Sequence, residues 1–221
     1  MNIRNIITSA SLLAADLSII GNEVVRCAAA KVDWIHFDVM DGRFVEQITY
    51  GAPVMKWLMK HCTLPMDVHL MVEDPTRQIE LFAAEGADII DIHIESSCDI
   101  SACLKRIREL GKRSALAVKP GTPVEEAYKY LPLCDMVLVM TVEPGYGGQG
   151  FIPEMLPKVR ALREYADSHG FPALDIQVDG GINPVTAEDA KLAGANVLVC
   201  GTGLFRSDDM SAVNAALKGT L

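Results

Sequence analysis

The amino-acid sequence predicts an α/β protein that folds as one closed (β/α)₈ barrel, the TIM-barrel fold, over residues 1–221. Three observations support this prediction. Short apolar runs alternate with longer segments of helical pattern, which is typical of a parallel sheet. The alternation repeats eight times without a long linker, and the chain length suits a single barrel. An open, doubly wound sheet is the competing interpretation, but no G-x-G-x-x-G motif follows the first apolar run.

Eight strands are expected, each a short run rich in Val, Ile, Leu or Met. In chain order they cover residues 6–9, 34–38, 66–69, 89–92, 114–118, 136–140, 175–178 and 197–200. Alternate residues of a strand share a face, so His36, Asp38 and Met40 are expected to point the same way.

Helices are expected between the strands, and two of them carry clear end signals. Segments 74–87 and 184–195 both finish in Gly-Ala, as expected where a helix ends. The dipeptides Asp74-Pro75 and Asn183-Pro184 have the form of an N-cap followed by proline at the first helical position.

The composition excludes several classes of protein. Hydrophobic residues make up 50% of the chain and charged residues 22%, so a disordered chain is not expected. The net charge of −9 argues against a nucleic-acid partner, although a small anionic ligand is compatible with it. The six cysteines form no C-x-x-C pair, so neither a zinc knuckle nor a redox motif is indicated.

No membrane association is expected from the sequence. No stretch approaches the roughly 20 apolar residues of a membrane-spanning helix. The first 16 residues resemble a weak signal peptide, but Thr8, Ser9 and Ser11 interrupt their apolar run. We therefore expect a cytoplasmic protein.

Titratable side chains gather where the strands are expected to end, which is where active sites lie in this fold. His36 and Asp38 follow the second strand, His69 the third and Asp179 the seventh. Two imidazoles and two carboxylates suit Zn²⁺, Fe²⁺, Mn²⁺ or Co²⁺ better than Ca²⁺ or Mg²⁺. The sequence therefore predicts one divalent metal ion. Three methionines near the same ends are expected to form an apolar wall around a bound anion: Met40, Met71 and Met140.

Glycine clusters follow the sixth, seventh and eighth strands. They read EPGYGGQG at 143–150, DGGIN at 179–183 and CGTGLF at 200–205. Glycine lets backbone amides approach an anion closely, and the loops after the last two strands commonly hold phosphate in this fold. A phosphorylated substrate is therefore expected.

These segments closely resemble the ribulose-phosphate 3-epimerase family. The stretches that carry the resemblance lie between residues 9 and 205: SASLLAADL, WIHFDVMDGRFV, DVHLMVEDP, VMTVEPGYGGQGFIPEMLPKV, QVDGGIN and AGANVLVCGTGLF. The resemblance implies a barrel of the ribulose-phosphate-binding type, a divalent ion (commonly Zn²⁺ or Fe²⁺) and a homo-oligomer. It also implies interconversion of D-ribulose 5-phosphate and D-xylulose 5-phosphate, by two-base proton transfer at C3 through a metal-stabilised enediolate.

The resemblance also implies roles for individual residues. His36, Asp38, His69 and Asp179 match the family's metal ligands, and the two aspartates match its acid/base pair. The positions expected to contact substrate are Ser11, Met40, His69, Met71, Met140, Gly145, Gly147, Gly148, Gly180, Gly181, Gly201 and Thr202.

Three departures from the family's usual pattern leave the exact sugar open. Glu46-Gln47 stand where the family commonly has Pro-Asn, Lys119 stands where it has Asn, and the glycine cluster after the sixth strand reads EPGYGGQ instead of NPGFGGQ. A 3-epimerase acting on a hexulose phosphate such as D-allulose 6-phosphate is therefore an alternative. A Schiff-base aldolase using Lys119 is a less favoured one.

A decarboxylase and a binding protein without catalysis are both disfavoured. A related phosphate-barrel decarboxylase would carry Asp-x-Lys-x-x-Asp where this chain reads His36-Phe37-Asp38-Val39-Met40-Asp41. A sugar-phosphate binding protein that has lost catalysis would not be expected to keep all four acid and ligand positions. His93 and Glu95 end the fourth strand, and either a role in orienting a metal ligand or simple filling of the barrel fits them.

Overall fold

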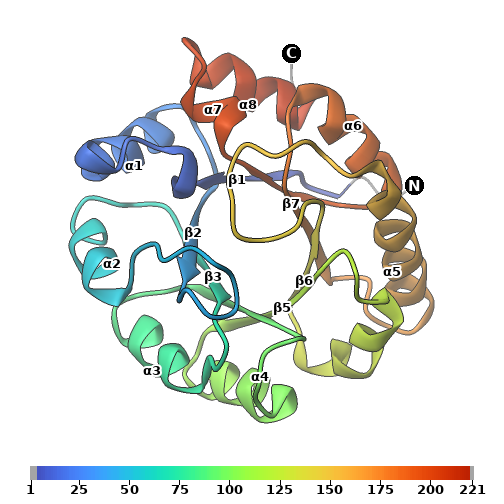
Figure 1. Ribbon diagram of the computed structural model, residues 1–221. Helices are drawn as coiled ribbons and strands as arrows, with labels where there is room; N and C mark the ends of the chain where they lie inside the picture. The colour runs from blue at the N-terminus through green and yellow to red at the C-terminus, as the bar shows by residue number, and fades with distance from the viewer. Residues whose placement is uncertain (1–3, 220–221) are drawn as a thin grey trace.

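The computed structural model describes residues 4–219 and shows a closed barrel of eight parallel strands, which confirms the expected fold class. The strands follow one another around the barrel in sequence order, and helices form the outer ring (Figure 1). Residues 1–3 and 220–221, the ends of the expected domain, lie outside the described residues. The strands are β1 Ile7–Ser11, β2 Trp34–Met40, β3 Met66–Met71, β4 Ile89–His93, β5 Arg113–Val118, β6 Met136–Met140, β7 Asp175–Asp179 and β8 Val197–Cys200.

The outer ring consists of α-helices and short 3₁₀ segments. The α-helices are α1 Ile20–Ala29, α2 Ala52–Leu58, α3 Thr76–Ala84, α4 Ile100–Glu109, α5 Leu156–Ser168, α6 Pro184–Ala193, α7 Thr202–Phe205 and α8 Met210–Lys218. The 3₁₀ segments are η1 Leu12–Ala14, η2 Leu17–Ile19, η3 Val124–Leu133 and η4 Pro153–Met155. No helix within residues 4–219 is long and apolar enough to cross a bilayer.

The expected strand boundaries are correct for β6 and β8 and too short at the carboxyl ends of five others. β1, β2, β3, β4 and β7 continue through one or two further residues, among them Ser11, His93 and Asp179. Hydropathy places the end of these strands too early, because the residues that follow are polar or border polar ones. The barrel continues the strands because these residues still pair in register with the next strand, as Asp179 does with Met140.

The helix-end signals are confirmed in one case and wrong by one residue in the other. The Asn183 side chain accepts hydrogen bonds from the backbone of Val185 and Thr186, and the Thr186 hydroxyl accepts one from the Asn183 backbone, which closes a capping box on α6. Helix α3 begins at Thr76, so Pro75 takes the cap position that we expected for Asp74. The Asp74 carboxylate instead accepts from the Thr76 backbone N–H at 3.0 Å.

Apolar side chains close the bottom of the barrel, and polar ones fill its upper part. An interior cluster at the amino ends of the strands consists of Trp34, Ile89, Ala115, Met136 and Val197. Above it the strand register pairs His36 with Asp67 and Asp38 with His69. The barrel interior therefore changes from a hydrophobic plug to a polar site along its axis.

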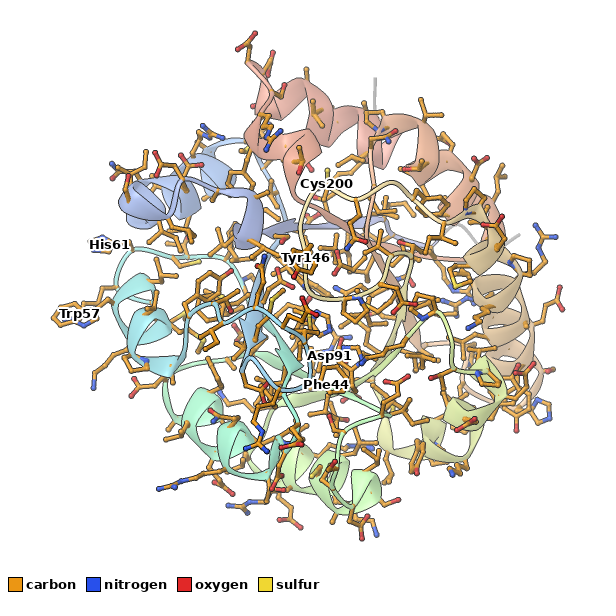
Figure 2. All side chains as sticks on the ribbon, viewed as in Figure 1. Phe44, Trp57, His61, Asp91, Tyr146 and Cys200 are labelled. Carbon is orange, nitrogen blue, oxygen red and sulfur yellow. The ribbon has the colours of Figure 1, made fainter. Side chains whose placement is uncertain are left out.

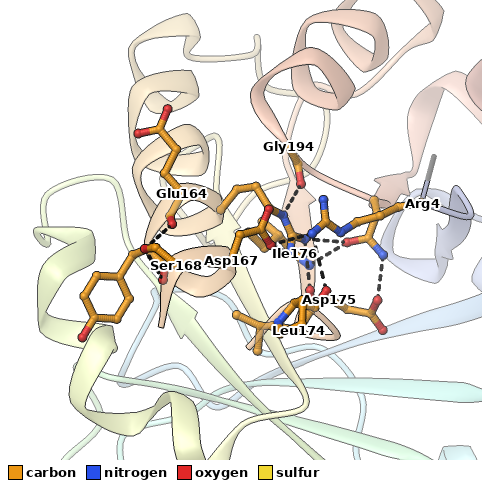
Figure 3. Close-up of polar contacts among 12 residues, drawn as sticks. Arg4, Glu164, Asp167, Ser168, Leu174, Asp175, Ile176 and Gly194 are labelled. Atoms are coloured by element: carbon orange, nitrogen blue, oxygen red, sulfur yellow. Dashed lines mark hydrogen bonds and ion pairs between the residues drawn. The ribbon is translucent and has the colours of Figure 1, made fainter. Parts of the chain in front are cut away.

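Helix α5 is held against the sheet by a buried arginine. The Arg163 guanidinium donates to the backbone carbonyls of Gly194 and Leu174, at 3.1 and 3.0 Å. Nearby, Arg4 donates to Asp167 at 2.6 Å (Figure 3). The two Arg163 contacts tie α5 to the loops that lead into β7 and β8, the strands whose carboxyl ends carry part of the site.

Asp91 on β4 is a buried acid whose replacement is expected to stabilise the fold. It lies inside the ring of strands (Figure 2) and is fully buried. No donor among residues 4–219 contacts either of its side-chain oxygens. Burial, with a further contribution from the charge of Asp67, raises the pKa of Asp91 well above its ordinary value. The folded protein therefore holds a proton that the unfolded chain has released, and stability is lost as the pH rises from about 4.

We therefore expect Asp91→Asn to raise the free energy of unfolding by about 2 kcal/mol at neutral pH. The gain should be smaller at pH 5, because the free energy needed to protonate the Asp91 carboxyl falls as the pH approaches the pKa of the unfolded chain. Urea unfolding of both proteins at pH 5 and pH 7.5 measures the difference. An equal or lower stability of the variant at pH 7.5 would contradict this assignment.

Candidate active site

A cavity of about 620 Å³ opens at the carboxyl ends of the strands, and the residues expected to act there converge on it. The imidazoles of His36 and His69 are fully buried, and both approach Asp38 on the cavity floor. Neither histidine is among the residues that line the cavity, although His69 was expected to contact substrate. The expected residues that line the cavity are Ser11, Asp38, Met40, Met71, Met140, Gly145, Gly147, Gly148, Asp179, Gly180, Gly181, Gly201 and Thr202.

Four side chains on the floor form a cluster that can hold a metal ion. His36, Asp38, His69 and Asp179 each offer one ligand atom, and these atoms all lie within 4.8 Å of one another. His36 Nε2 lies 3.3 Å from His69 Nδ1 and 3.3 Å from Asp38 Oδ1. Asp179 Oδ2 lies 3.9 Å from His36 Nε2. Ligands at about 2.1 Å around a tetrahedral ion are roughly 3.4 Å apart, so the donor set fits a divalent transition ion.

Asp67 and Gln177 orient the first of these ligands, and neither was among the residues expected from the sequence. Asp67 Oδ2 accepts from His36 Nδ1 at 2.8 Å and from Gln177 Nε2 at 2.7 Å. With its proton on Nδ1, His36 presents the lone pair of Nε2 to the other three ligands. A signal for Asp67 exists, because it precedes His69 by two residues and so shares its face of the strand.

The two carboxylates of the cluster have opposite pKa shifts. Burial alone would raise the pKa of Asp38, but the imidazoles of His36 and His69 outweigh it and hold that pKa below its usual range. Burial raises the pKa of Asp179 to about 6, and the charge of Asp38 adds to the shift by opposing its ionisation. Burial would also lower the pKa of His36, yet its two acidic neighbours raise it. Such a pair favours one ionised and one protonated carboxylate.

A glycine-rich wall forms a second part of the cavity lining. It comes from the loops after β6, β7 and β8 and includes Thr202, whose side chain carries a hydroxyl. In the described part of the chain, no lysine or arginine lines the cavity. An anion bound here would therefore depend on backbone N–H groups and hydroxyls.

Gly181 is where this wall is most crowded. Its φ is +68°, and a Cβ atom there would lie 2.3 Å from the backbone nitrogen of Phe151.

We expect Gly181→Ala to raise KM for a phosphorylated substrate about tenfold or more, because displacing this backbone removes hydrogen bonds to a charged group. Gly111→Ala is the matched control, since Gly111 has φ +74° but open space around it. Steady-state kinetics of both variants test this. An unchanged KM in Gly181→Ala would contradict phosphate binding at the glycine-rich wall.

The loop after β6, which lines the cavity, contacts the loop after β2 through Tyr146 and Glu46, two residues that depart from the family's usual pattern. The Tyr146 hydroxyl donates to Glu46 Oε2 at 2.8 Å. Beside this contact, a Cβ atom on Gly145 would lie 3.2 Å from Val45. The loop after β6 therefore rests on the loop after β2.

Lys119 lies away from the cavity. Its ammonium sits over the Phe44 ring, 3.6 Å from the centroid, and within residues 4–219 it is not among the cavity-lining side chains. The Phe44 ring in turn lies 4.7 Å from the His93 ring. The less favoured alternative, in which Lys119 is the nucleophile of a Schiff-base aldolase, has no geometric support.

Comparisons with known proteins identify the family and the fold of this chain. The ribulose-phosphate 3 epimerase family model matches residues 7–205. A ribulose-phosphate 3-epimerase from Synechocystis sp. is 42% identical over 219 residues, which cover 98% of this chain and 95% of that enzyme. The cytoplasmic isoform from Oryza sativa subsp. japonica is 42% identical, with 94% and 91% covered. The crystal structure of KGPDC from Streptococcus mutans has a TM-score of 0.73 at 14% identity, covers 98% of this chain and 97% of its own, and shows the shared fold.

Proposed function

The chain belongs to the ribulose-phosphate 3-epimerase family, and from that premise we propose that it interconverts D-ribulose 5-phosphate and D-xylulose 5-phosphate in the cavity. The observation that carries this proposal is the four-ligand cluster on the cavity floor. The glycine-rich wall of the same cavity supplies a place for the phosphate.

The carboxylates of Asp38 and Asp179 are proposed to move the protons. Inversion of a carbon centre requires proton removal on one face and delivery on the other, so each carboxylate serves one face. They come from β2 and β7, and both line the cavity. The Ser11 hydroxyl donates to Asp38 Oδ2 at 2.7 Å, which fixes the orientation of that carboxylate.

His36, Asp38, His69 and Asp179 are proposed to hold one divalent ion, Zn²⁺ or Fe²⁺ first and Mn²⁺ or Co²⁺ next, because mixed imidazole and carboxylate ligands suit these ions. When bound, the ion supplies Lewis-acid stabilisation of the negative charge that develops as the carbon beside the ketone loses its proton. Met40, Met71 and Met140 are each no more than 3% exposed and exclude water from the same space.

The substrate assignment is tested by kcat/KM for D-ribulose 5-phosphate and D-allulose 6-phosphate measured side by side. We expect the pentulose to be preferred by at least about tenfold, which corresponds to roughly 1.4 kcal/mol. A preference for the hexulose would contradict the proposal and favour the alternative 3-epimerase.

Borohydride trapping with substrate should leave Lys119 unmodified. A trapped adduct would instead support the aldolase.

We further propose that residues 1–221 form one catalytic domain and that the protein acts in the cytoplasm as a homo-oligomer. One relative, that of Oryza sativa, is a cytoplasmic isoform, which supports the location.

Trp57 projects from α2 with 63% of its surface exposed, as large apolar side chains at subunit contacts do (Figure 2). Light scattering at micromolar concentration tests the oligomeric state, and a monomer would contradict it.

A further inference from the structure

A continuous line of hydrogen bonds runs from the second histidine of the cluster to the loop after β5. His69 Nε2 lies 2.8 Å from His93 Nε2, and His93 Nδ1 lies 3.1 Å from Glu95 Oε2. The other carboxylate oxygen, Glu95 Oε1, accepts from the Lys119 backbone N–H at 2.9 Å and from the Thr122 hydroxyl at 2.5 Å. The line thus begins at a fixed backbone donor and ends at the metal cluster.

The line has only one consistent direction. A backbone N–H can only donate, so Glu95 accepts at this end and, as a carboxylate, accepts at its other oxygen as well. His93, as a neutral imidazole, must then carry its proton on Nδ1, which leaves Nε2 as an acceptor. His69 must donate from Nε2 to that acceptor, so the lone pair of His69 lies on Nδ1. This atom is the one that faces His36 Nε2 at 3.3 Å and Asp38 Oδ1 at 3.4 Å.

The histidine end of the line is shielded from water, which makes an error of direction there costly, whereas the Glu95 side chain at the other end is 22% exposed. His69 and His93 are both fully buried. The Phe44 ring packs against His93, and the Lys119 ammonium also contacts that ring. In such surroundings two N–H donors that face each other cannot bond to water instead, so both remain unpaired.

We propose that His93 and Glu95 are positioning residues that fix the tautomer of His69, so that Nδ1 is the atom offered to the ion. The inference rests on the metal site of the proposed function. It also gives Lys119 a role, through its backbone N–H and its cover over Phe44, that does not involve its amine as a nucleophile. Simple filling of the barrel, the competing interpretation, would make the charge of Glu95 irrelevant to the ion.

The change Glu95→Gln separates the two interpretations because it keeps the size and shape of the side chain. If the amide oxygen stays on Lys119 N–H and Thr122, the amide NH₂ faces His93 and reverses its tautomer. His93 and His69 then meet as two donors, unless His69 moves its proton to Nδ1, where it opposes metal binding. If the amide turns around, its NH₂ meets the Lys119 N–H instead. Either arrangement should lower the affinity of the cluster for a metal ion.

We expect Glu95→Gln to raise the dissociation constant for Zn²⁺ by about 10- to 100-fold. Competition between metal-free protein and a chromophoric chelator measures this without reference to activity. Thr122→Val, which leaves the Lys119 donor in place, should raise it by a smaller factor. Glu73→Gln is the matched control: its carboxylate pairs with Arg43 and is 48% exposed, so its Zn²⁺ affinity should equal that of the parent.

Without an ion, His69 in Glu95→Gln can carry its proton on Nδ1, which faces Asp38 Oδ1, so two donors need not meet. The melting temperature of each metal-free variant should therefore stay within about 3 °C of the parent, which separates a changed site from a damaged fold. Unchanged Zn²⁺ affinity in Glu95→Gln, with normal melting, would overturn the positioning role and leave the proposed function standing. Failure of the parent protein to bind Zn²⁺, Fe²⁺, Mn²⁺ or Co²⁺ would instead overturn the proposed function.

Discussion

Replacing either Asp38 or Asp179 with asparagine is expected to lower kcat for 3-epimerisation by at least about a thousandfold. An amide has the shape of the carboxylate but cannot accept the C3 proton or return it. Each aspartate also belongs to the four-ligand cluster, so both variants lose a metal ligand together with a proton carrier. Rates should be measured with metal added in excess, after metal content is determined, so that the loss of the proton carrier is seen separately.

Asp189→Asn is the matched control for these variants. Asp189 also lines the cavity but lies outside the four-ligand cluster, so the same chemical change there should retain at least about half of the activity. Turnover above about a tenth of the parent rate in Asp38→Asn or Asp179→Asn, at full metal occupancy, would contradict a mechanism that uses both carboxylates.

Removal of the metal is expected to reduce activity to less than about 1% of the starting value. The four ligands lie at mutual distances suited to a divalent ion. Without the ion, nothing in the cluster supplies a comparable positive charge to stabilise the reaction. One equivalent of Zn²⁺ or Fe²⁺ should restore the rate, while Ca²⁺ should not, because it prefers a larger shell of oxygen ligands. Because the ion binds only the folded state, its return should also raise the melting temperature.

The chelation experiment has a clear opposite outcome. Full activity in a preparation shown by elemental analysis to hold less than about one ion in a hundred proteins would contradict the metal assignment. Extensive dialysis against chelator, followed by removal of the chelator, avoids direct inhibition by the chelator itself.

Much of the fold follows from the alternation of apolar runs and helical patterns, because each parallel strand is buried on both faces and reads as a short apolar segment. The same reasoning ends β2 at Asp38, whereas the strand continues to Met40. Strand ends that carry an active site are polar by function, so hydropathy places the boundary too early where the chemistry begins.

The ligand cluster could also be predicted, because the spacing of His36 and Asp38 and their place at strand ends are sequence properties. The side chains that orient the ligands could not be predicted with the same ease. Gln177 meets Asp67 from across the barrel, and their contact depends on the closure of the sheet. The direction of the His69 and His93 hydrogen bond depends on a backbone N–H of the loop after β5, which no residue-type pattern reveals.

Epimerisation of D-ribulose 5-phosphate in D₂O tests the two-carboxylate mechanism most directly. Because one carboxylate removes the C3 proton and the other delivers its own, the D-xylulose 5-phosphate formed should carry one deuterium at C3 from the first turnover. Proton NMR of product collected at low conversion measures this. Product that retains its original hydrogen at C3 would contradict proton transfer by Asp38 and Asp179.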